Sequence, residues 1–485
     1  IFVGLSVLFA SCTKMLEEKP EDRLFSAGFY KTSSDAVAAV NAIYTPFGDG
    51  NSYSFRYFVL NTAMEDYATG KGQFVFFGQY QALPGTAVAI TDGAWAVWYQ
   101  VINAANIVLK YVPPISMDAT QKNAILGEAR FLRALGYFNL VKNWGGVPII
   151  SKPTESPEEA NGGKREAVSD VYAFILDDLK FAEVNLPLKQ IQTGRPTSGA
   201  AKTMLADVYL IREDWTNARI KADEVIKSGA YGLVSVSQSA DFEQIFGADY
   251  PTSSEDIFSI KFARIVGLGT QLPAFFHNSD AAWAARGFGT FSGRTTYPLL
   301  AQWSNSDLRK AYNLYTQYPN KSGTIVNNPS SDPIRFGKFK DSKATDNTAH
   351  GTSAPIYRYP DALLIYAEAA SQENNGPTAI ALERLNMVHR RAYGFNATAT
   401  SPADFSLTGQ TAQSFRDLVI KERAYEFMVE GGKRWRDLVR TGTAAQAIKA
   451  AKGIDINPAS YLFPIPQQEI DNNPDIDQKD QNPGY

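Results

Sequence analysis

Apolar residues recur at intervals of three and four along most of the chain, which is the spacing of amphipathic helices. The clearest stretches cover residues 34–43, 95–109 and 119–142. The second ends before Pro113 and Pro114, since proline cannot continue a helix. The third carries apolar rows on two sides, so we expect it to pack against neighbours on both flanks.

Two further stretches alternate small and large residues in the manner of tetratricopeptide hairpins. Residues 198–227 place alanines in a first predicted helix, which Tyr209 closes, and Trp215 opens a second helix. Residues 361–391 repeat the arrangement. We therefore predict an all-α fold with a tetratricopeptide-like helical-repeat scaffold.

Residues 229–355 interrupt this helical pattern. They are rich in Gly, Ser, Asn, Thr and Pro, with only short β-prone runs such as residues 257–262, so we predict a loop-rich, largely irregular lobe. Such insertions usually lie on one face of a helical array, often the ligand-binding face. The expected organisation is one domain over residues 12–485, with the scaffold mainly at 33–228 and 356–442, the insertion at 229–355 and an extended C-terminal tail at 455–485.

Composition excludes several classes of function. The 47 basic and 50 acidic residues leave a net charge of −3, so the chain offers no basic surface for nucleic acid. A single cysteine excludes a disulfide framework and thiolate-rich metal sites. His277, His350 and His389 lie far apart in the sequence and form no HExxH motif, so we expect no catalytic metal.

The first residues have the features of a lipoprotein leader. Residues 1–11 are apolar but too short to span a bilayer as a helix, and the small residues Ala10 and Ser11 precede Cys12 as in a bacterial lipobox. We interpret residues 1–11 as part of a signal peptide and Cys12 as the lipidated residue. An incidental buried thiol is the alternative.

Aromatic residues are concentrated at residues 51–100, where twelve of fifty side chains are aromatic and only five are charged. Many of these rings could belong to the core, and we expect this of Trp95. Others could stack on the apolar faces of sugar rings. The candidate ligand-binding residues, taken from this region and from the loop around Trp283, are Asp66, Tyr67, Phe76, Tyr80, Trp98, Trp283, Phe288 and Phe291.

Three carboxylates recur at intervals of four on a strongly helical stretch, at Glu422, Glu426 and Glu430. Paired carboxylates can perform acid–base catalysis. The same stretch carries several arginines, which favours structural ion pairs over catalysis. The chain also contains no GxSxG, GxGxxG or GxxxxGK[ST] motif, so we expect no enzyme.

Several segments together resemble a known family, the SusD/RagB nutrient-binding outer-membrane lipoproteins of Bacteroidetes. The most recognisable is EARFLRALGYFNLVKNWGGVPII, at residues 128–150. The other similar segments, in the same order as in the family, are residues 357–369, 385–394, 420–442 and 462–485. The resemblance therefore runs from the lipobox to the last residue.

The resemblance implies a function. Such a protein is held by its lipid on the exterior of the outer membrane, binds oligosaccharide or polysaccharide, and delivers it to a SusC-like TonB-dependent transporter without catalysis. Some members hold calcium, but this sequence has no acidic loop of the EF-hand type, so we expect no cofactor and leave a structural calcium ion open.

The similar segments themselves contain residues with structural roles. Gly145 and Gly146 should form a tight turn, Trp144 and Trp435 should pack in the core, and Arg423 should form an ion pair with Glu426.

Other functions stay open beside glycan capture. A surface-tethered helical-repeat adaptor for protein–protein assembly would bury the aromatic rings of residues 51–100 and 270–300. The captured nutrient could also be something other than a sugar. A glycoside hydrolase would need two carboxylates about 5–10 Å apart in an open cleft, and no motif indicates such a pair.

Overall fold

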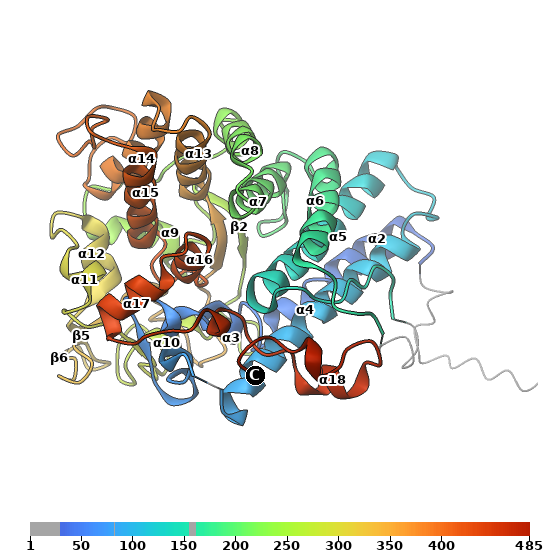
Figure 1. The fold of residues 1–485 in the computed structure, drawn as a ribbon, viewed down its shortest axis with the longest axis horizontal. Helices are drawn as coiled ribbons and strands as arrows, with labels where there is room; N and C mark the ends of the chain where they lie inside the picture. The colour runs from blue at the N-terminus through green and yellow to red at the C-terminus, as the bar shows by residue number, and fades with distance from the viewer. Residues whose placement is uncertain (1–29, 82, 155–161) are drawn as a thin grey trace, which may run out of the picture.

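The computed structural model describes residues 30–81, 83–154 and 162–485, and helices dominate them (Figure 1). The helices of the first half stack in chain order, each against the next. Their bounds are α2 Ser33–Ala42, α4 Gly85–Tyr111, α5 Ala119–Trp144, α6 Val168–Asn185, α7 Ser198–Ile211 and α8 Trp215–Lys227. The fold confirms the predicted all-α class, and helices were predicted correctly at residues 34–43, 95–109 and 119–142.

The second half of the scaffold continues the same array. Helix α8 packs against α13, so two helices that are neighbours in the array are separated in the sequence by the whole insertion (Figure 1). The bounds are α13 Tyr359–Glu373, α14 Ala379–Ala392, α15 Ala412–Glu426, α16 Lys433–Arg440 and α17 Ala444–Lys452. Both predicted hairpins are present, as the pairs α7–α8 and α13–α14.

Local signals in the sequence set several helix ends. The Thr32 and Asp118 side chains accept hydrogen bonds from backbone amides in the first turns of α2 and α5, which satisfies donors that the helix leaves free. Helix α5 ends at Trp144 and is followed by Gly145, whose φ of 76° is unfavourable for other residues. A Cβ at Gly146 would lie 2.2 Å from the Glu166 carbonyl oxygen, so the predicted glycine turn is required by close packing.

The insertion between α8 and α13 contains only short elements. Strand β2 pairs antiparallel with β8 where the insertion meets the scaffold, and β1 pairs with β3 to join it to the N-terminal region. The strands are β1 Thr69–Gly70, β2 Asp256–Ile260, β3 Phe291–Ser292, β4 Leu314–Tyr315, β5 Gln317–Pro319, β6 Ile325–Asn327, β7 Arg335–Phe336 and β8 Ala354–Arg358. The short helices are α9 Glu243–Phe246, α10 Leu272–Phe276, α11 Pro298–Ala301 and α12 Leu308–Asn313. A further short helix, α3 Arg56–Val59, lies between α2 and α4.

A buried network of charges joins α15 to the insertion. The Glu426 carboxylate lies 3.1 Å from Arg309, 3.0 Å from Arg358 and 2.5 Å from Arg391. Glu422 and Glu430 are also buried and paired with cationic side chains, although the helix ends at Glu426 and Glu430 lies in the turn after it. The three carboxylates therefore neutralise buried arginines and lysines, as the structural interpretation of the sequence predicted.

The predicted Arg423–Glu426 ion pair is wrong. Arg423 instead lies 2.7 Å from Asp437 of α16, while Glu426 contacts the guanidinium groups of the insertion and α14. The two residues lie three apart on α15, and each meets a closer partner on a neighbouring element.

The C-terminal tail is folded rather than extended. It contains α18, Gln467–Asn472, and packs across the end of α5 (Figure 1). The Trp144 indole donates a hydrogen bond of 3.0 Å to the Pro464 carbonyl, and the Asn482 side chain donates one of 2.9 Å to the Trp144 carbonyl. The tail is ordered because it satisfies polar groups at the buried end of α5.

The N-terminal prediction is outside the described residues, and this includes the leader at 1–11 and Cys12. In the part that the structure describes, no helix combines the length and hydrophobicity needed to cross a membrane.

Candidate functional site

Three of the predicted binding residues are buried. Trp98, Tyr67 and Phe291 are fully inaccessible to solvent. Trp98 packs edge-on against Tyr57, and the Tyr67 hydroxyl accepts a hydrogen bond of 2.8 Å from the Val429 amide. Their rings have no free face, so these three predictions are wrong as stacking residues, and the rings belong to the core.

Three more predicted residues are buried or half-buried by contacts within the protein. Asp66 is buried and forms two hydrogen bonds, of 3.0 and 2.7 Å, with the Arg434 guanidinium, which removes it from ligand binding. Tyr80 is half-buried, with its hydroxyl donating to the Met64 carbonyl. Phe76 is half-buried and packs against the core, so only part of its ring is accessible.

The remaining two predicted residues, Trp283 and Phe288, lie on one loop at residues 279–289. Phe288 is 47 % exposed and packs against Phe275, with ring centroids 5.0 Å apart. Trp283 is half-buried, with Tyr315 packed edge-to-face at 4.9 Å. The loop therefore presents two aromatic side chains that are both supported by other rings and partly open to solvent.

Hydrogen bonds from its backbone hold this loop in one shape. The amides of Phe288 and Gly289 donate to carbonyls of α10 and His277, at 2.6 and 2.7 Å. The Ala285 amide donates to Nε2 of His350 at 3.1 Å, which gives that histidine a structural role. A Cβ on Gly287 would lie 2.1 Å from the Asn278 carbonyl oxygen, so the loop can pack this closely only with glycine there.

Cationic side chains lie around the loop. Arg286, on the loop itself, lies 5.8 Å from the centre of the Phe288 ring, and the Lys321 ammonium donates a hydrogen bond to the Ala285 carbonyl. Burial, with the Lys340 ammonium nearby, lowers the pKa of His277 to about 3, so the imidazole is neutral at physiological pH. Burial also lowers the pKa of Lys340, whose Nζ lies 4.4 Å from the centre of the Trp283 ring. Two partly exposed rings beside cationic groups suit a ligand that has both apolar faces and polar groups.

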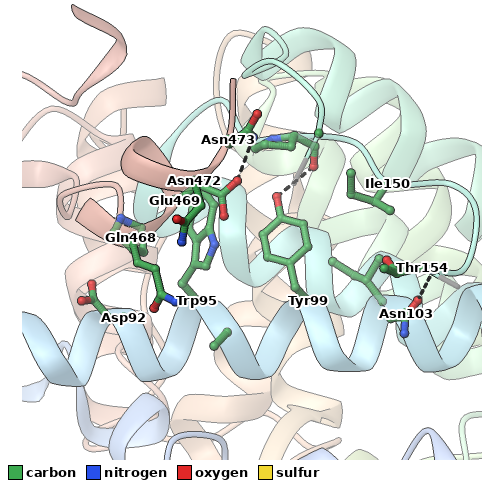
Figure 2. Close-up of a pocket in the computed structure, with 15 residues that line it drawn as sticks. Asp92, Trp95, Tyr99, Asn103, Ile150, Thr154, Gln468, Glu469, Asn472 and Asn473 are labelled. Atoms are coloured by element: carbon green, nitrogen blue, oxygen red, sulfur yellow. Dashed lines mark hydrogen bonds between the residues drawn. The ribbon is translucent and has the colours of Figure 1, made fainter. Parts of the chain in front are cut away.

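A second candidate place is a cavity of about 300 Å³ between α4 and α18 (Figure 2). Trp95, Tyr99 and Asn103 line it from α4, at helical spacing on one face. Gln468 and Asn472 line it from α18. The segment after α5 closes another side with Pro148, Ile150 and Thr154.

Trp95 shows what the sequence reasoning missed. It was predicted to be core, and it is only 4 % exposed and packs against Trp144. Its remaining surface lines the cavity. Nothing local in the sequence signals this, because the opposite wall comes from α18, more than 370 residues further along the chain.

Neither place is arranged as a metal centre. In the described residues, no three His, Cys, Asp or Glu side chains come together as ligands for a metal ion. His389 is instead paired with Glu422 at 3.0 Å. The absence of a cofactor stays a prediction, and a structural calcium ion stays open beside it.

Two family models match the chain. One, described as "SusD family", matches residues 281–485. The other, described as "Starch-binding associating with outer membrane", matches residues 30–210. Together they span most of the scaffold and more than half of the insertion.

Relatives and solved structures agree with these matches over nearly the whole chain. SusD-like protein P2 of Formosa agariphila is 25 % identical, covering 100 % of this chain and 99 % of its own. A SusD homolog from Bacteroides thetaiotaomicron has a TM-score of 0.82 at 22 % identity, covering 95 % of this chain and 98 % of its own. A laminarin-binding SusD-like protein has a TM-score of 0.73 at 25 % identity, with 94 % and 100 % covered.

Proposed function

Because the chain belongs to the SusD/RagB family, we propose that it is a cell-surface glycan-binding lipoprotein that captures oligosaccharide and delivers it to a SusC-like TonB-dependent transporter. The matching family description associates its members with starch and the outer membrane. One similar structure is a laminarin-binding protein, and another is surface glycan-binding protein A of Bacteroides thetaiotaomicron. These support glycan as the class of ligand.

The observation that carries the proposal on this chain is the pair of rings at Trp283 and Phe288. Both are partly accessible, and both lie on a loop fixed by backbone hydrogen bonds. A rigid aromatic surface loses little conformational entropy on binding, and it can pack on the C–H faces of a sugar ring. The sugar hydroxyls would meet neighbouring polar groups such as the Lys340 ammonium.

We propose binding without catalysis. A glycosidase needs two carboxylates in an open cleft. Glu422 and Glu426 of α15 and Glu430, in the turn after it, are buried and paired with cations, so none is free to transfer a proton. This supports a role in capture, with cleavage left to other proteins.

Anchoring would come from a lipid on Cys12, which tethers the protein to the outer face of the outer membrane. Capture at that surface is useful only if the glycan then enters the cell. An oligosaccharide that is too large to diffuse across the outer membrane requires a transporter. The adaptor alternative expects every ring to be buried. The rings at Trp283 and Phe288 do not meet that expectation.

The test is affinity electrophoresis of the protein, produced without residues 1–12, in gels that contain one polysaccharide each: laminarin, starch, xylan, pectin or mannan. Trp283→Ala and Phe288→Ala run beside the wild type. Phe395→Ala is the matched control, because Phe395 is a phenylalanine of similar exposure that follows α14, outside the loop.

We expect one polymer to retard the wild type and the Phe395→Ala variant, and either loop substitution to weaken this retardation about tenfold or more. If no polymer retards the wild type, the adaptor or the non-sugar alternative replaces glycan capture. If retardation persists unchanged in both loop variants, the protein binds glycan at another place.

A further inference from the structure

The cavity between α4 and α18 has unused capacity for hydrogen bonds. In the described part of the chain, the side chains of Asp92, Gln468 and Asn472 form no hydrogen bond with other protein groups, although all three line the cavity (Figure 2). Asp92 is half-buried, whereas Gln468 and Asn472 are exposed. Oδ1 of Asp92 is also buried. A buried acceptor such as Oδ1 of Asp92 normally has a partner, so its free state indicates a place where a ligand could donate a hydrogen bond.

Other polar groups of the cavity are held in place by the fold. The Tyr99 hydroxyl donates a hydrogen bond of 2.8 Å to the Pro148 carbonyl, and Oδ1 of Asn103 accepts one of 2.9 Å from the Thr154 amide. The Asn473 side chain donates a hydrogen bond of 2.9 Å to Oε1 of Glu469. These bonds fix the walls, which leaves the free groups on a preformed surface.

The free groups are of mixed type. The amides of Gln468 and Asn472 each offer both a donor and an acceptor, and the Asp92 carboxylate accepts. A sugar hydroxyl likewise donates one hydrogen bond and accepts others. The Trp95 and Tyr99 rings, 5.2 Å apart, add an apolar surface beside these groups. This combination of rings, amides and a carboxylate suits a pyranose ring.

The charge of the cavity walls narrows the class of sugar that could bind. Asp92 and Glu469 contribute two carboxylates, and no lysine, arginine or histidine is among the described residues that line the cavity. An acidic sugar would bring a third negative charge without a cation to pair with it. The walls therefore disfavour uronic acids and sulfated sugars.

We propose that this cavity is a second carbohydrate site, which binds a single uncharged sugar residue or chain end. Its volume of about 300 Å³ is at the small end of ligand pockets, so it suits one terminal residue better than a long segment. None of the residues that line it belongs to the loop at 279–289. The proposal therefore does not rest on glycan binding at Trp283 and Phe288.

Saturation-transfer NMR tests the proposal with simple probes. Glucose, galactose, mannose, N-acetylglucosamine and glucuronate would each be added at about 10 mM, a range suited to weak binding. The protein would be the Trp283→Ala/Phe288→Ala double variant, in which the loop rings are absent. Any signal then comes from elsewhere in the molecule.

Two substitutions on α4 make the comparison sharp. Ala96→Trp would fill the cavity from an exposed position on its wall, so folding should be preserved. Gln100→Trp is the matched control, because Gln100 is exposed on the same helix but does not line the cavity. Gln468→Ala/Asn472→Ala removes free hydrogen-bonding groups without filling space.

We expect at least one neutral sugar to give a signal that Gln100→Trp preserves and that Ala96→Trp and Gln468→Ala/Asn472→Ala reduce about tenfold. Glucuronate should give none. The proposal is overturned if no neutral sugar gives a signal sensitive to Ala96→Trp, and the charge argument is overturned if glucuronate binds equally well. Because the loop is disabled throughout, failure here leaves the electrophoresis result unaffected.

Discussion

Glu65 provides a prediction about stability that can be worked through in numbers. Its side chain is completely buried, next to the Asp66–Arg434 ion pair. Burial, helped by the nearby Asp66 charge, raises the pKa of Glu65 from 4.5 to about 8, although Tyr67 and Arg434 oppose the shift. The folded protein therefore holds a proton on Glu65 at neutral pH.

The direction of the change in stability with pH follows from the linkage between protonation of Glu65 and folding. In the unfolded chain Glu65 loses its proton above pH 4.5, whereas in the folded protein it keeps it up to about pH 8. The unfolded state is therefore favoured progressively over this interval, by about 1.4 kcal/mol for each pH unit. The total loss of unfolding free energy is about 5 kcal/mol at most by pH 8, and about 3 kcal/mol at pH 7.

Glu65→Gln should remove this loss, because glutamine stays neutral at every pH. Urea unfolding followed by circular dichroism, at pH 5 and pH 8, measures it. The variant should gain several kcal/mol relative to the wild type between the two pH values, and packing changes cancel in that comparison. Glu213→Gln, at an exposed glutamate, is the control and should show no such gain. An equal difference between Glu65→Gln and wild type at both pH values would refute the reasoning.

Two other substitutions test the packing of the fold. Glu426→Gln leaves three buried arginines without their shared carboxylate, so it should lower the unfolding free energy by about 3–5 kcal/mol in urea; a change below about 1 kcal/mol would contradict the network. Gly146→Ala should cost about 1–3 kcal/mol, because its Cβ would clash with the Glu166 carbonyl. Gly85→Ala, with nothing within 4 Å of the new Cβ, should be nearly neutral, and equal effects of the two glycine changes would count against the clash.

The helices could be predicted from sequence because their signals are local. Capping side chains at Thr32 and Asp118, apolar spacing of three and four, and the prolines after α4 all act within a few residues of a helix end. The hairpins α7–α8 and α13–α14 were predictable for the same reason. The folded C-terminal tail was not, since its order depends on Trp144, about 320 residues earlier.

Accessibility of the aromatic rings could not be predicted in this way. Whether Tyr67 is core or surface is decided by Val429, which is 362 residues away in sequence. Trp98 is buried against Tyr57 and Phe291 against Phe74, which are also distant in sequence, while Phe288 stays 47 % exposed. Composition indicated that the chain is rich in rings, but only the tertiary contacts decide which of them a ligand could reach.

The most direct test of glycan capture is a crystal structure of the protein with an oligosaccharide from the polymer that retards it most strongly. We expect sugar rings in contact with Trp283 or Phe288, and a second, terminal sugar residue between Trp95 and Asn472. An oligosaccharide bound with neither Trp283 nor Phe288 in contact would contradict the placement of the site, and a protein that binds none of the polymers would contradict glycan capture itself.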